Sequence, residues 1–365
     1  MNTTLRVLVV DDTIIYRKIV SDILKTMPGI EVIGVAHNGK IARDKIRLLK
    51  PDLITLDIEM PVVNGIELLE DLKESNIDVG VVMLSTLTSK GSDMTLKALE
   101  LGAFDFILKP QSTSSADNVS SLEASLKNAI NTYRLRNTSL KRGKTHLSKR
   151  STIPQPPPKR ITPVVGGQQR KSKSEIVTIG VSTGGPNALT LLLPMLPGDL
   201  GVPIVIVQHM PPVFTASLAA SLDKKCALKV KEAENREVLQ KNTVYIAPGG
   251  KQMRITAALD GMDRLIKITD DPPENSCKPA ADYLFRSVAD YYVGRCTAVI
   301  LTGMGSDGTK GLKVLKEKGA FVIGQNEGTC VVYGMPKSAY ESGVVDTVLP
   351  LKDIATAITN SVKRI

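Results

Sequence analysis

The stretch from Ile176 to Pro186 combines the signals of a buried strand, a tight turn and a helix start. It opens with β-branched and apolar residues, passes through small residues, and ends at a proline, which is favoured in the first turn of a helix. Within it, Gly180-Val181-Ser182-Thr183-Gly184 fits the G-x-S-x-G pattern, whose glycines allow a sharp turn that exposes the serine hydroxyl. Ser182 is therefore a candidate nucleophile. The alternatives are a glycine-rich helix start that binds an anion and a purely structural turn.

A serine nucleophile needs a neighbouring base to take its proton, and histidine is the usual base near neutral pH. The chain has three histidines, of which His37 lies in the first third and His146 in a basic segment. His209 follows the apolar run Ile204–Gln208, so it is the histidine base that this part of the chain offers. Catalytic residues of open parallel sheets cluster at the carboxyl ends of strands, and the position of His209 agrees with that rule.

A third apolar run, Thr297–Leu301, leads into a glycine-rich turn that contains Asp307. This carboxylate can hold His209 in the productive tautomer and stabilise its imidazolium. The alternative is that Asp307 only caps the helix that follows it. The chain order Ser, His, Asp differs from the Ser, Asp, His order of α/β-hydrolases, which implies another fold. Further apolar runs alternate with helical segments, which indicates a doubly wound, mostly parallel α/β sheet covered on both faces.

Taken together, these motifs resemble the catalytic domain of the chemotaxis protein-glutamate methylesterases over residues 175 to 360. The segments that carry the resemblance are Ile179–Pro186, Gln208–Pro211, Ala247–Gly249, Leu284–Ala289, Leu301–Gly308 and Cys330–Pro336. The resemblance implies that Ser182, His209 and Asp307 form the catalytic triad, and that Thr183 and Met304 line the site, where a backbone N–H helps to form an oxyanion hole. Two departures concern substrate recognition: Gln252 and Cys277-Lys278 stand where histidine and histidine-arginine are common in the family.

The first third of the chain places acids at the ends of two apolar runs. Leu5–Val10 stops at Asp11 and Asp12, and Leu53–Leu56 stops at Asp57. In a parallel sheet these ends face the same way, so the three carboxylates can converge. Three carboxylates that close repel one another unless a hard divalent cation neutralises them, and Mg²⁺ prefers such oxygen ligands.

Two further strands deliver a hydroxyl and an ammonium group to the same edge, since Ser85 and Thr86 follow one run and Lys109 follows another. A carboxylate, a metal site, a hydroxyl and an ammonium suit the receipt of a phosphoryl group. The alternative is an acidic strand-end surface with a structural Lys-Pro turn.

This arrangement resembles the receiver domain of two-component response regulators over residues 3 to about 125, with a flavodoxin-like fold. The resemblance implies that Asp57 is phosphorylated, that Asp12, Asp57 and the carbonyl of Glu59 bind Mg²⁺ directly, and that Asp11 acts through water. It also assigns the phosphorylation switch to three residues, Ser85, Phe106 and Lys109. His37 lies away from this site and is interpreted as an ordinary loop residue.

Net charge separates the two halves from the segment between them. Residues 136–174 carry eleven Lys and Arg and no acid, which leaves 36 basic against 37 acidic residues elsewhere, although the whole chain is at +10. This segment lacks apolar periodicity, so it is predicted to be a flexible linker with a stiffer proline-rich centre. Contact of the linker with an acidic partner or membrane headgroups is the functional alternative. The predicted domains are therefore 1–135, 136–174 and 175–365.

Composition limits the remaining possibilities. No apolar run reaches 18 residues and no signal peptide is evident, so we expect a cytoplasmic protein with no membrane insertion. The four cysteines, Cys226, Cys277, Cys296 and Cys330, have no C-x-x-C spacing, which favours reduced thiols over zinc ligands or disulfides.

The sequence thus predicts a monomeric response regulator whose output domain is a serine hydrolase. The resemblance implies that it hydrolyses glutamyl methyl esters on chemoreceptors, deamidates glutamines there, and receives its phosphoryl group from a chemotaxis histidine kinase. Mg²⁺ is expected only in the receiver domain, and no cofactor in the hydrolase. A DNA-binding regulator is the first alternative, but the basic charge lies in the linker and no nucleic-acid partner is expected. A stand-alone phosphate sink would leave the triad unexplained.

Overall fold

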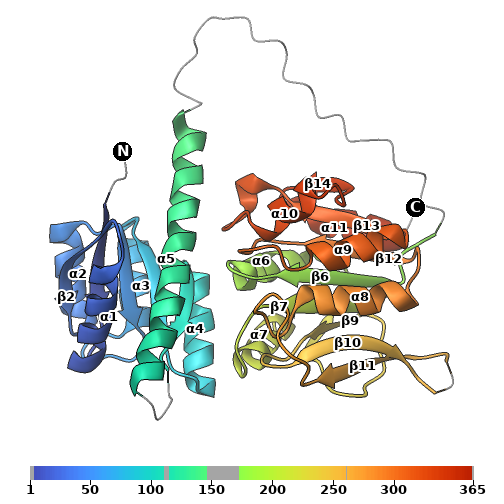
Figure 1. The fold of residues 1–365 in the computed structure, drawn as a ribbon, viewed down its shortest axis with the longest axis horizontal. Helices are drawn as coiled ribbons and strands as arrows, with labels where there is room; N and C mark the ends of the chain where they lie inside the picture. The colour runs from blue at the N-terminus through green and yellow to red at the C-terminus, as the bar shows by residue number, and fades with distance from the viewer. Residues whose placement is uncertain (1–3, 111–114, 146–171, 260, 364–365) are drawn as a thin grey trace, which may run out of the picture. The chain divides into compact units, whose positions relative to one another are not determined.

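The computed structural model describes residues 4–110, 115–145, 172–259 and 261–363 (Figure 1). The chain divides into two compact units, residues 1–141 and 142–365. Most of the predicted linker, including His146, lies outside the described residues. Among the described residues, no helix combines the length and the apolar character that crossing a membrane requires.

The first unit is a five-stranded parallel sheet with the strand order β2-β1-β3-β4-β5. Strand β3 is buried along its whole length, as expected for a parallel sheet covered on both faces. A capping box between Asn64 and Glu67 fixes the start of α3, because each side chain accepts a hydrogen bond from the backbone of the other residue. The strands are β1 (Leu5–Val10), β2 (Ile30–Ala36), β3 (Leu53–Asp57), β4 (Gly80–Ser85) and β5 (Asp105–Leu108). The helices are α1 (Ile14–Thr26), α2 (Gly39–Leu49), α3 (Gly65–Glu74), α4 (Ser89–Leu101) and α5 (Ser115–Thr145).

Helix α5 continues beyond residue 135, where the first domain was predicted to end. Its last part, from Leu135 to Thr145, is rich in Leu, Lys and Arg, which are good helix formers. This part contains no acidic residue, which would disfavour a helix C-terminus. The change in composition therefore precedes the end of the helix.

The second unit is built on a seven-stranded parallel sheet with the order β14-β13-β12-β6-β7-β9-β8. The chain starts at the central strand β6, winds outward through β7, and returns to the other side of β6 at β12. Its strands are β6 (Ile176–Val181), β7 (Ile204–Gln208), β8 (Lys229–Glu232), β9 (Thr243–Ile246), β12 (Cys296–Ile300), β13 (Phe321–Gln325) and β14 (Thr347–Leu349). This reversal of strand order between β6 and β12 is where open α/β sheets bind ligands, outside the carboxyl ends of the strands.

Helices pack in two groups. Helix α9 contacts α8 and α10, and their apolar side chains, with those of β7 and β12, form one core cluster. Helix α6 contacts α7 and α11. The helices are α6 (Gly185–Leu192), α7 (Phe214–Asp223), α8 (Ala281–Tyr291), α9 (Thr309–Glu317), α10 (Met335–Glu341) and α11 (Leu351–Lys363), with short 3₁₀ turns at Leu193–Met195 and Glu327–Thr329.

An antiparallel hairpin, β10 (Gln252–Ala257) and β11 (Arg264–Thr269), lies outside the main sheet and was not expected (Figure 1). Its buried Met253 and Ile255 flank the less buried Arg254, and Gly261 supplies the positive φ of the connecting turn. This hairpin carries the chain toward the loop that precedes α8.

Candidate functional site

Three neighbouring strands, β12, β6 and β7, carry the predicted catalytic residues beyond their carboxyl ends. Ser182 follows β6, and its backbone N–H donates to the carbonyl of Thr302 beyond β12, at 3.0 Å. His209 follows β7, and its backbone N–H donates to the carbonyl of Val181 at 3.0 Å. Backbone hydrogen bonds at the sheet edge therefore bring the serine and histidine turns side by side.

The turn after Ser182 requires glycine at two positions. Gly184 has a φ of +77°, in the left-handed region, where it precedes the first residue of α6. A Cβ atom on Gly185 would lie 2.0 Å from Oε1 of Gln208, whose amide Nε2 donates to the carbonyl of Ser182 at 3.0 Å. Gly184 belongs to the G-x-S-x-G pattern, whereas Gly185, which lets the turn close against β7, follows it.

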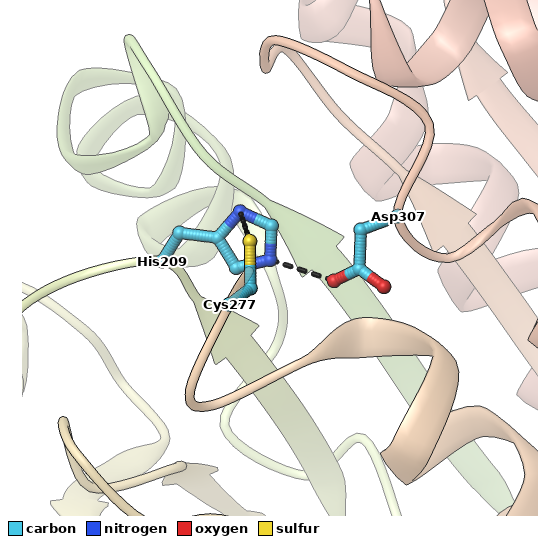
Figure 2. A group of neighbouring side chains, drawn as sticks. All are labelled: His209, Cys277 and Asp307. Carbon is cyan, nitrogen blue, oxygen red and sulfur yellow. Dashed lines mark hydrogen bonds and ion pairs between the residues drawn. The ribbon is translucent and has the colours of Figure 1, made fainter. Parts of the chain in front are cut away.

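His209 and Asp307 form a close pair, with Nε2 of the imidazole 2.7 Å from Oδ2 of the carboxylate (Figure 2). Asp307 is 3% exposed and also accepts hydrogen bonds from the backbone N–H groups of Ala281, at 2.6 Å, and Asp282, at 3.1 Å. Asn275 donates its amide Nδ2 to the same carboxylate at 2.9 Å. Burial raises the pKa of Asp307, but the contact with His209 and the two backbone hydrogen bonds outweigh it and lower the pKa below its usual range.

An ionised carboxylate can only accept a hydrogen bond, so Nε2 of His209 must carry the proton in its contact with Asp307. Burial lowers the pKa of His209, but its hydrogen bonds to Asp307 and Cys277 outweigh burial and raise the pKa to about 9. The other ring nitrogen, Nδ1, lies 3.6 Å from Sγ of Cys277 (Figure 2). In the neutral imidazole Nδ1 is therefore the atom that can take a proton.

The hydroxyl of Ser182 makes no hydrogen bond in this structure within the described parts of the chain. Nδ1 of His209 faces Cys277 instead. The structure thus brings His209 and Asp307 into contact and places Ser182 on the adjoining strand end, without a direct hydrogen bond from the serine to the imidazole. Such catalytic hydrogen bonds often tighten only in the substrate complex.

The two residues expected to line the oxyanion hole lie in the Ser182 turn and in the loop that passes it. Thr183 is within the turn itself, and its carbonyl accepts from the hydroxyl of Thr302 at 3.0 Å. Met304 lies in the loop after β12 and is 40% exposed. A Cβ on Gly303, next to Met304, would lie 2.7 Å from Cβ of Ser182, so this loop passes close to the serine.

Sequence reasoning missed Asn275 and Asp282. Asp282 is fully buried at the start of α8, accepts from the amide of Asn275 at 2.9 Å, and accepts from the backbone N–H of Gly311 in α9 at 2.6 Å. Asp307 precedes α9 yet accepts from the first N–H groups of α8, so each carboxylate caps the other's helix. The alternative that Asp307 caps the helix following it is wrong, because the N-cap residue of α9 is a glycine and makes no side-chain cap. Asp307 caps α8, a helix distant in sequence, which no local pattern indicates.

Gln252, one of the two departures from the family pattern, is buried and holds the loop that carries Cys277. Its Oε1 accepts from the backbone N–H of Ala280 at 2.9 Å, and its Nε2 donates to the carbonyl of Pro272 at 3.1 Å. Cys277, the other departure, contacts the imidazole directly. Both departures therefore lie at or beside the site.

In the first unit, Lys109 joins two of the predicted carboxylates. Its Nζ lies 2.8 Å from Oδ2 of Asp11 and 2.7 Å from Oδ2 of Asp57, and all three side chains are buried. Burial raises the pKa of Asp57 to about 6, although Lys109 opposes the shift. Burial lowers the pKa of Lys109, but Asp57 and Asp11 outweigh it and raise the pKa.

The acidic cluster has the donor set that Mg²⁺ requires. Carboxylate oxygens of Asp11, Asp12 and Asp57 lie within 4.8 Å of one another. Oδ2 of Asp11 is buried and close to Lys109, but it has no hydrogen bond of good geometry among the described residues, so it retains a lone pair for a cation or its water. The residues present therefore fit the hard, oxygen-ligated ion.

The other predicted phospho-signalling residues surround this cluster. The hydroxyl of Ser85 is buried at the end of β4 and lies 2.7 Å from the hydroxyl of Thr95 in α4. Phe106 is partly buried in β5. The Glu59 side chain turns outward to Lys90, 3.6 Å away, so the backbone carbonyl is the atom of Glu59 that remains as a candidate Mg²⁺ ligand. His37 follows β2 and is exposed, and the residue before it, Ala36, accepts from the backbone N–H of Asp11 at 3.1 Å.

The fold and these two sites define a class of protein: a response regulator whose output domain is a doubly wound α/β hydrolase. The family model described as CheB methylesterase matches residues 177–358, and the response regulator receiver domain matches residues 7–118. A protein-glutamate methylesterase/protein-glutamine glutaminase of Desulfotalea psychrophila is 65% identical over 364 residues, covering 98% of this chain and 99% of that protein. The protein of the same name from Bacillus subtilis is 43% identical over 363 residues, covering 99% of both.

A solved structure adds to this likeness. The catalytic domain of Thermotoga maritima CheB methylesterase is 43% identical and covers 52% of this chain and 99% of its own, with a TM-score of 0.50. The chain belongs to the CheB methylesterase family.

Proposed function

We propose that this protein hydrolyses glutamyl methyl esters on chemoreceptors and deamidates glutamines there, under the control of phosphorylation at Asp57. The observation that carries the proposal is the 2.7 Å pair of His209 and Asp307 beside the strand-end Ser182, at the reversal of strand order. The names of the full-length relatives support both activities. The enzyme acts as a monomer in the cytoplasm. It has no nucleic-acid partner.

In this mechanism His209 turns from Cys277 to the serine. Nδ1 accepts the Ser182 proton as the oxygen attacks the ester carbonyl, while Nε2–H remains bonded to Asp307, which stabilises the imidazolium. Backbone N–H groups near Thr183 and Met304 stabilise the oxyanion. His209 then returns the proton to the leaving methoxide, and methanol departs. Water, activated by the same nitrogen, hydrolyses the acyl-enzyme to the free glutamate; with a glutamine substrate, ammonia leaves instead.

The test is methanol release from a receptor-derived methyl ester by Ser182→Ala. We expect a loss of roughly 10³-fold or more, because the members of such a triad act as a unit. Ser306→Ala is the matched control, since Ser306 is exposed in the same loop as Asp307. A folded Ser182→Ala protein with near wild-type release would remove Ser182 as the nucleophile.

In the receiver unit, residues 1–135, Asp57 accepts a phosphoryl group from a chemotaxis histidine kinase. Asp12, Asp57 and the Glu59 carbonyl would hold Mg²⁺ directly, with Asp11 acting through water. The ion would neutralise phosphoryl charge. Lys109 pairs with Asp57 before transfer and with the phosphoryl oxygens after it, and Ser85 and Phe106 respond by changing the receiver surface.

The linker, residues 136–174, keeps the receiver at a high effective concentration near the hydrolase, residues 175–365. The unphosphorylated receiver then inhibits the hydrolase and lowers its rate by a factor within the usual range of allosteric coupling, about 5–150-fold. A fragment beginning near Ser174 is therefore expected to exceed the unphosphorylated whole protein and to ignore a phospho-donor. Equal rates for both would mean that the receiver does not inhibit.

A further inference from the structure

The contact of Cys277 with His209 has no part in the proposed reaction. Sγ of Cys277 lies 3.6 Å from Nδ1, while Nε2 on the other side of the ring holds Asp307 (Figure 2). One ligand atom from each of the three residues lies within 4.8 Å of the others. The spacing of the cysteines disfavoured a zinc site, but spacing reveals only ligands that are close in sequence. The histidine that approaches Cys277 is 68 residues away.

We propose that Cys277 Sγ and His209 Nδ1 bind a thiophilic divalent cation of the Zn²⁺ type, and that the bound ion inhibits the hydrolase. Zinc bonds to sulfur and nitrogen are about 2.3 and 2.0–2.1 Å, so a tetrahedral ion needs an S to N separation of about 3.5 Å. The observed separation is 3.6 Å. An ion can therefore replace the proton that these two atoms share, with little movement of either side chain.

Asp307 holds the imidazole as metal-bound histidines require. A histidine that binds a metal through one nitrogen usually donates its other N–H to a carboxylate, which fixes the tautomer and the ring orientation. Here Nε2 and Oδ2 of Asp307 are 2.7 Å apart, and three further donors anchor that carboxylate: the backbone N–H groups of Ala281 and Asp282 and the amide of Asn275. The neutral ring is thus presented with its Nδ1 lone pair toward the thiol.

The surrounding charge also favours a cation. Asp282 and Asp307 are both buried, and within the described part of the chain neither has an ion pair with Lys or Arg. Arg286 is engaged by Glu274 through two hydrogen bonds, and Lys278 turns to Asp270. Asp307 pairs with the imidazole, and Asp282 lies next to it through their shared partner Asn275, so these two buried carboxylates lack a Lys or Arg partner in this part of the structure. A divalent ion would offset this negative charge.

Solvent can deliver the ion, because the His209 side chain is 13% exposed and Cys277 is partly exposed. Binding releases the thiol proton to solvent, together with the Nδ1 proton where His209 is protonated, and leaves two coordination positions for water. The ion occupies the lone pair of Nδ1 that would otherwise accept the Ser182 proton. Metal binding and ester hydrolysis therefore exclude each other.

Direct binding is measured with Co²⁺, whose thiolate complexes absorb in the near ultraviolet, on the full-length protein in excess Mg²⁺. The receiver holds no cysteine, so this band reports only the second unit. We expect one equivalent of the band, displaced by Zn²⁺. Cys277→Ser and His209→Gln should both lose it, whereas Cys226→Ser and Cys330→Ser, which remove other partly exposed thiols, should retain it. A band that survives Cys277→Ser, or no band in the wild type, would overturn the site.

Inhibition is measured as methanol release with and without Zn²⁺ for each variant, so that any change in basal rate cancels. Loss of a ligand should raise the inhibitory Zn²⁺ concentration of Cys277→Ser at least about tenfold, since even losing an outer-shell partner costs about 10–100-fold in metal affinity. A wild-type protein that shows the Co²⁺ band but keeps full activity with Zn²⁺ would overturn Nδ1 as the ligand. The Co²⁺ experiment measures binding whether or not Ser182 is the nucleophile, so failure of the metal site can be distinguished from failure of the proposed function.

Discussion

Replacing Asp307 with Asn tests the pairing on which the proposed mechanism depends. Oδ2 of Asp307 accepts from His209 Nε2 and from the backbone N–H of Ala281, while Oδ1 accepts from Asn275 and from the backbone N–H of Asp282. An amide offers only one acceptor oxygen, so its NH₂ group must face one of these donor pairs. His209 is the partner that can adapt, because its Nε2 can lose the proton and become an acceptor.

That adaptation produces the wrong tautomer. With the proton on Nδ1, His209 cannot take the hydroxyl proton of Ser182, and the same exchange in Ser-His-Asp triads lowers kcat about 10⁴-fold. This factor corresponds to about 5 kcal/mol of transition-state stabilisation. The N–H of Ala281 also loses its acceptor, and a buried unpaired donor costs about 1–3 kcal/mol of unfolding free energy.

Asp282→Asn is the control that separates the two effects. Asp282 is equally buried and caps α9 through Gly311, but it does not touch the imidazole. We expect both variants to lose similar stability in urea denaturation, whereas only Asp307→Asn loses methanol release by about 10⁴-fold and shows the Nδ1–H tautomer of His209 in ¹⁵N NMR. Equal losses of activity in the two variants would mean that Asp307 acts only through the fold.

Three other outcomes are expected. With a chelator present, kcat/KM should rise with pH, reach half of its maximum near pH 9 and level off above it, since protonated His209, whose pKa is raised to about 9, cannot act as a base; a profile that is flat above pH 7 would contradict this. Asp57→Asn should abolish Mg²⁺-dependent labelling by a phospho-donor while basal esterase activity remains, and persistent labelling would place the phosphoryl group elsewhere. Gly249→Ala should lower unfolding free energy by about 1–3 kcal/mol, because the new Cβ would lie 2.3 Å from the backbone of Pro211, whereas Gly328→Ala meets open space; equal stability would refute the clash.

The strands could be predicted because parallel strands buried on both faces read as continuous apolar runs. The run that opens at Ile176 is β6, and the run Ile204–Gln208 before His209 is β7 with the predicted bounds. Their neighbouring positions then follow from the parallel sheet, whose carboxyl ends share one edge. For this reason two residues 27 positions apart in sequence could be assigned to one site.

The contacts around these residues could not be predicted from periodicity. Asn275 and Cys277 lie in an irregular loop, which Gln252 holds in place from the start of β10. Asn275 also has a φ of +52°, a conformation that asparagine tolerates but that no hydrophobic pattern encodes. Long-range side-chain bonds place the loop, so its approach to His209 is a property of the tertiary structure.

Capping and catalysis, two separate interpretations of Asp307 at the level of sequence, are linked by its environment. A carboxylate that is 3% exposed would tend to be neutral, because burial penalises its charge. The backbone N–H groups at the start of α8 donate to it, and the positive end of the helix dipole favours a negative group there. These contacts, together with His209, keep the pKa of Asp307 low. Only an ionised Asp307 fixes the proton on Nε2 and leaves Nδ1 free, so the cap of α8 is what makes the carboxylate useful to the imidazole.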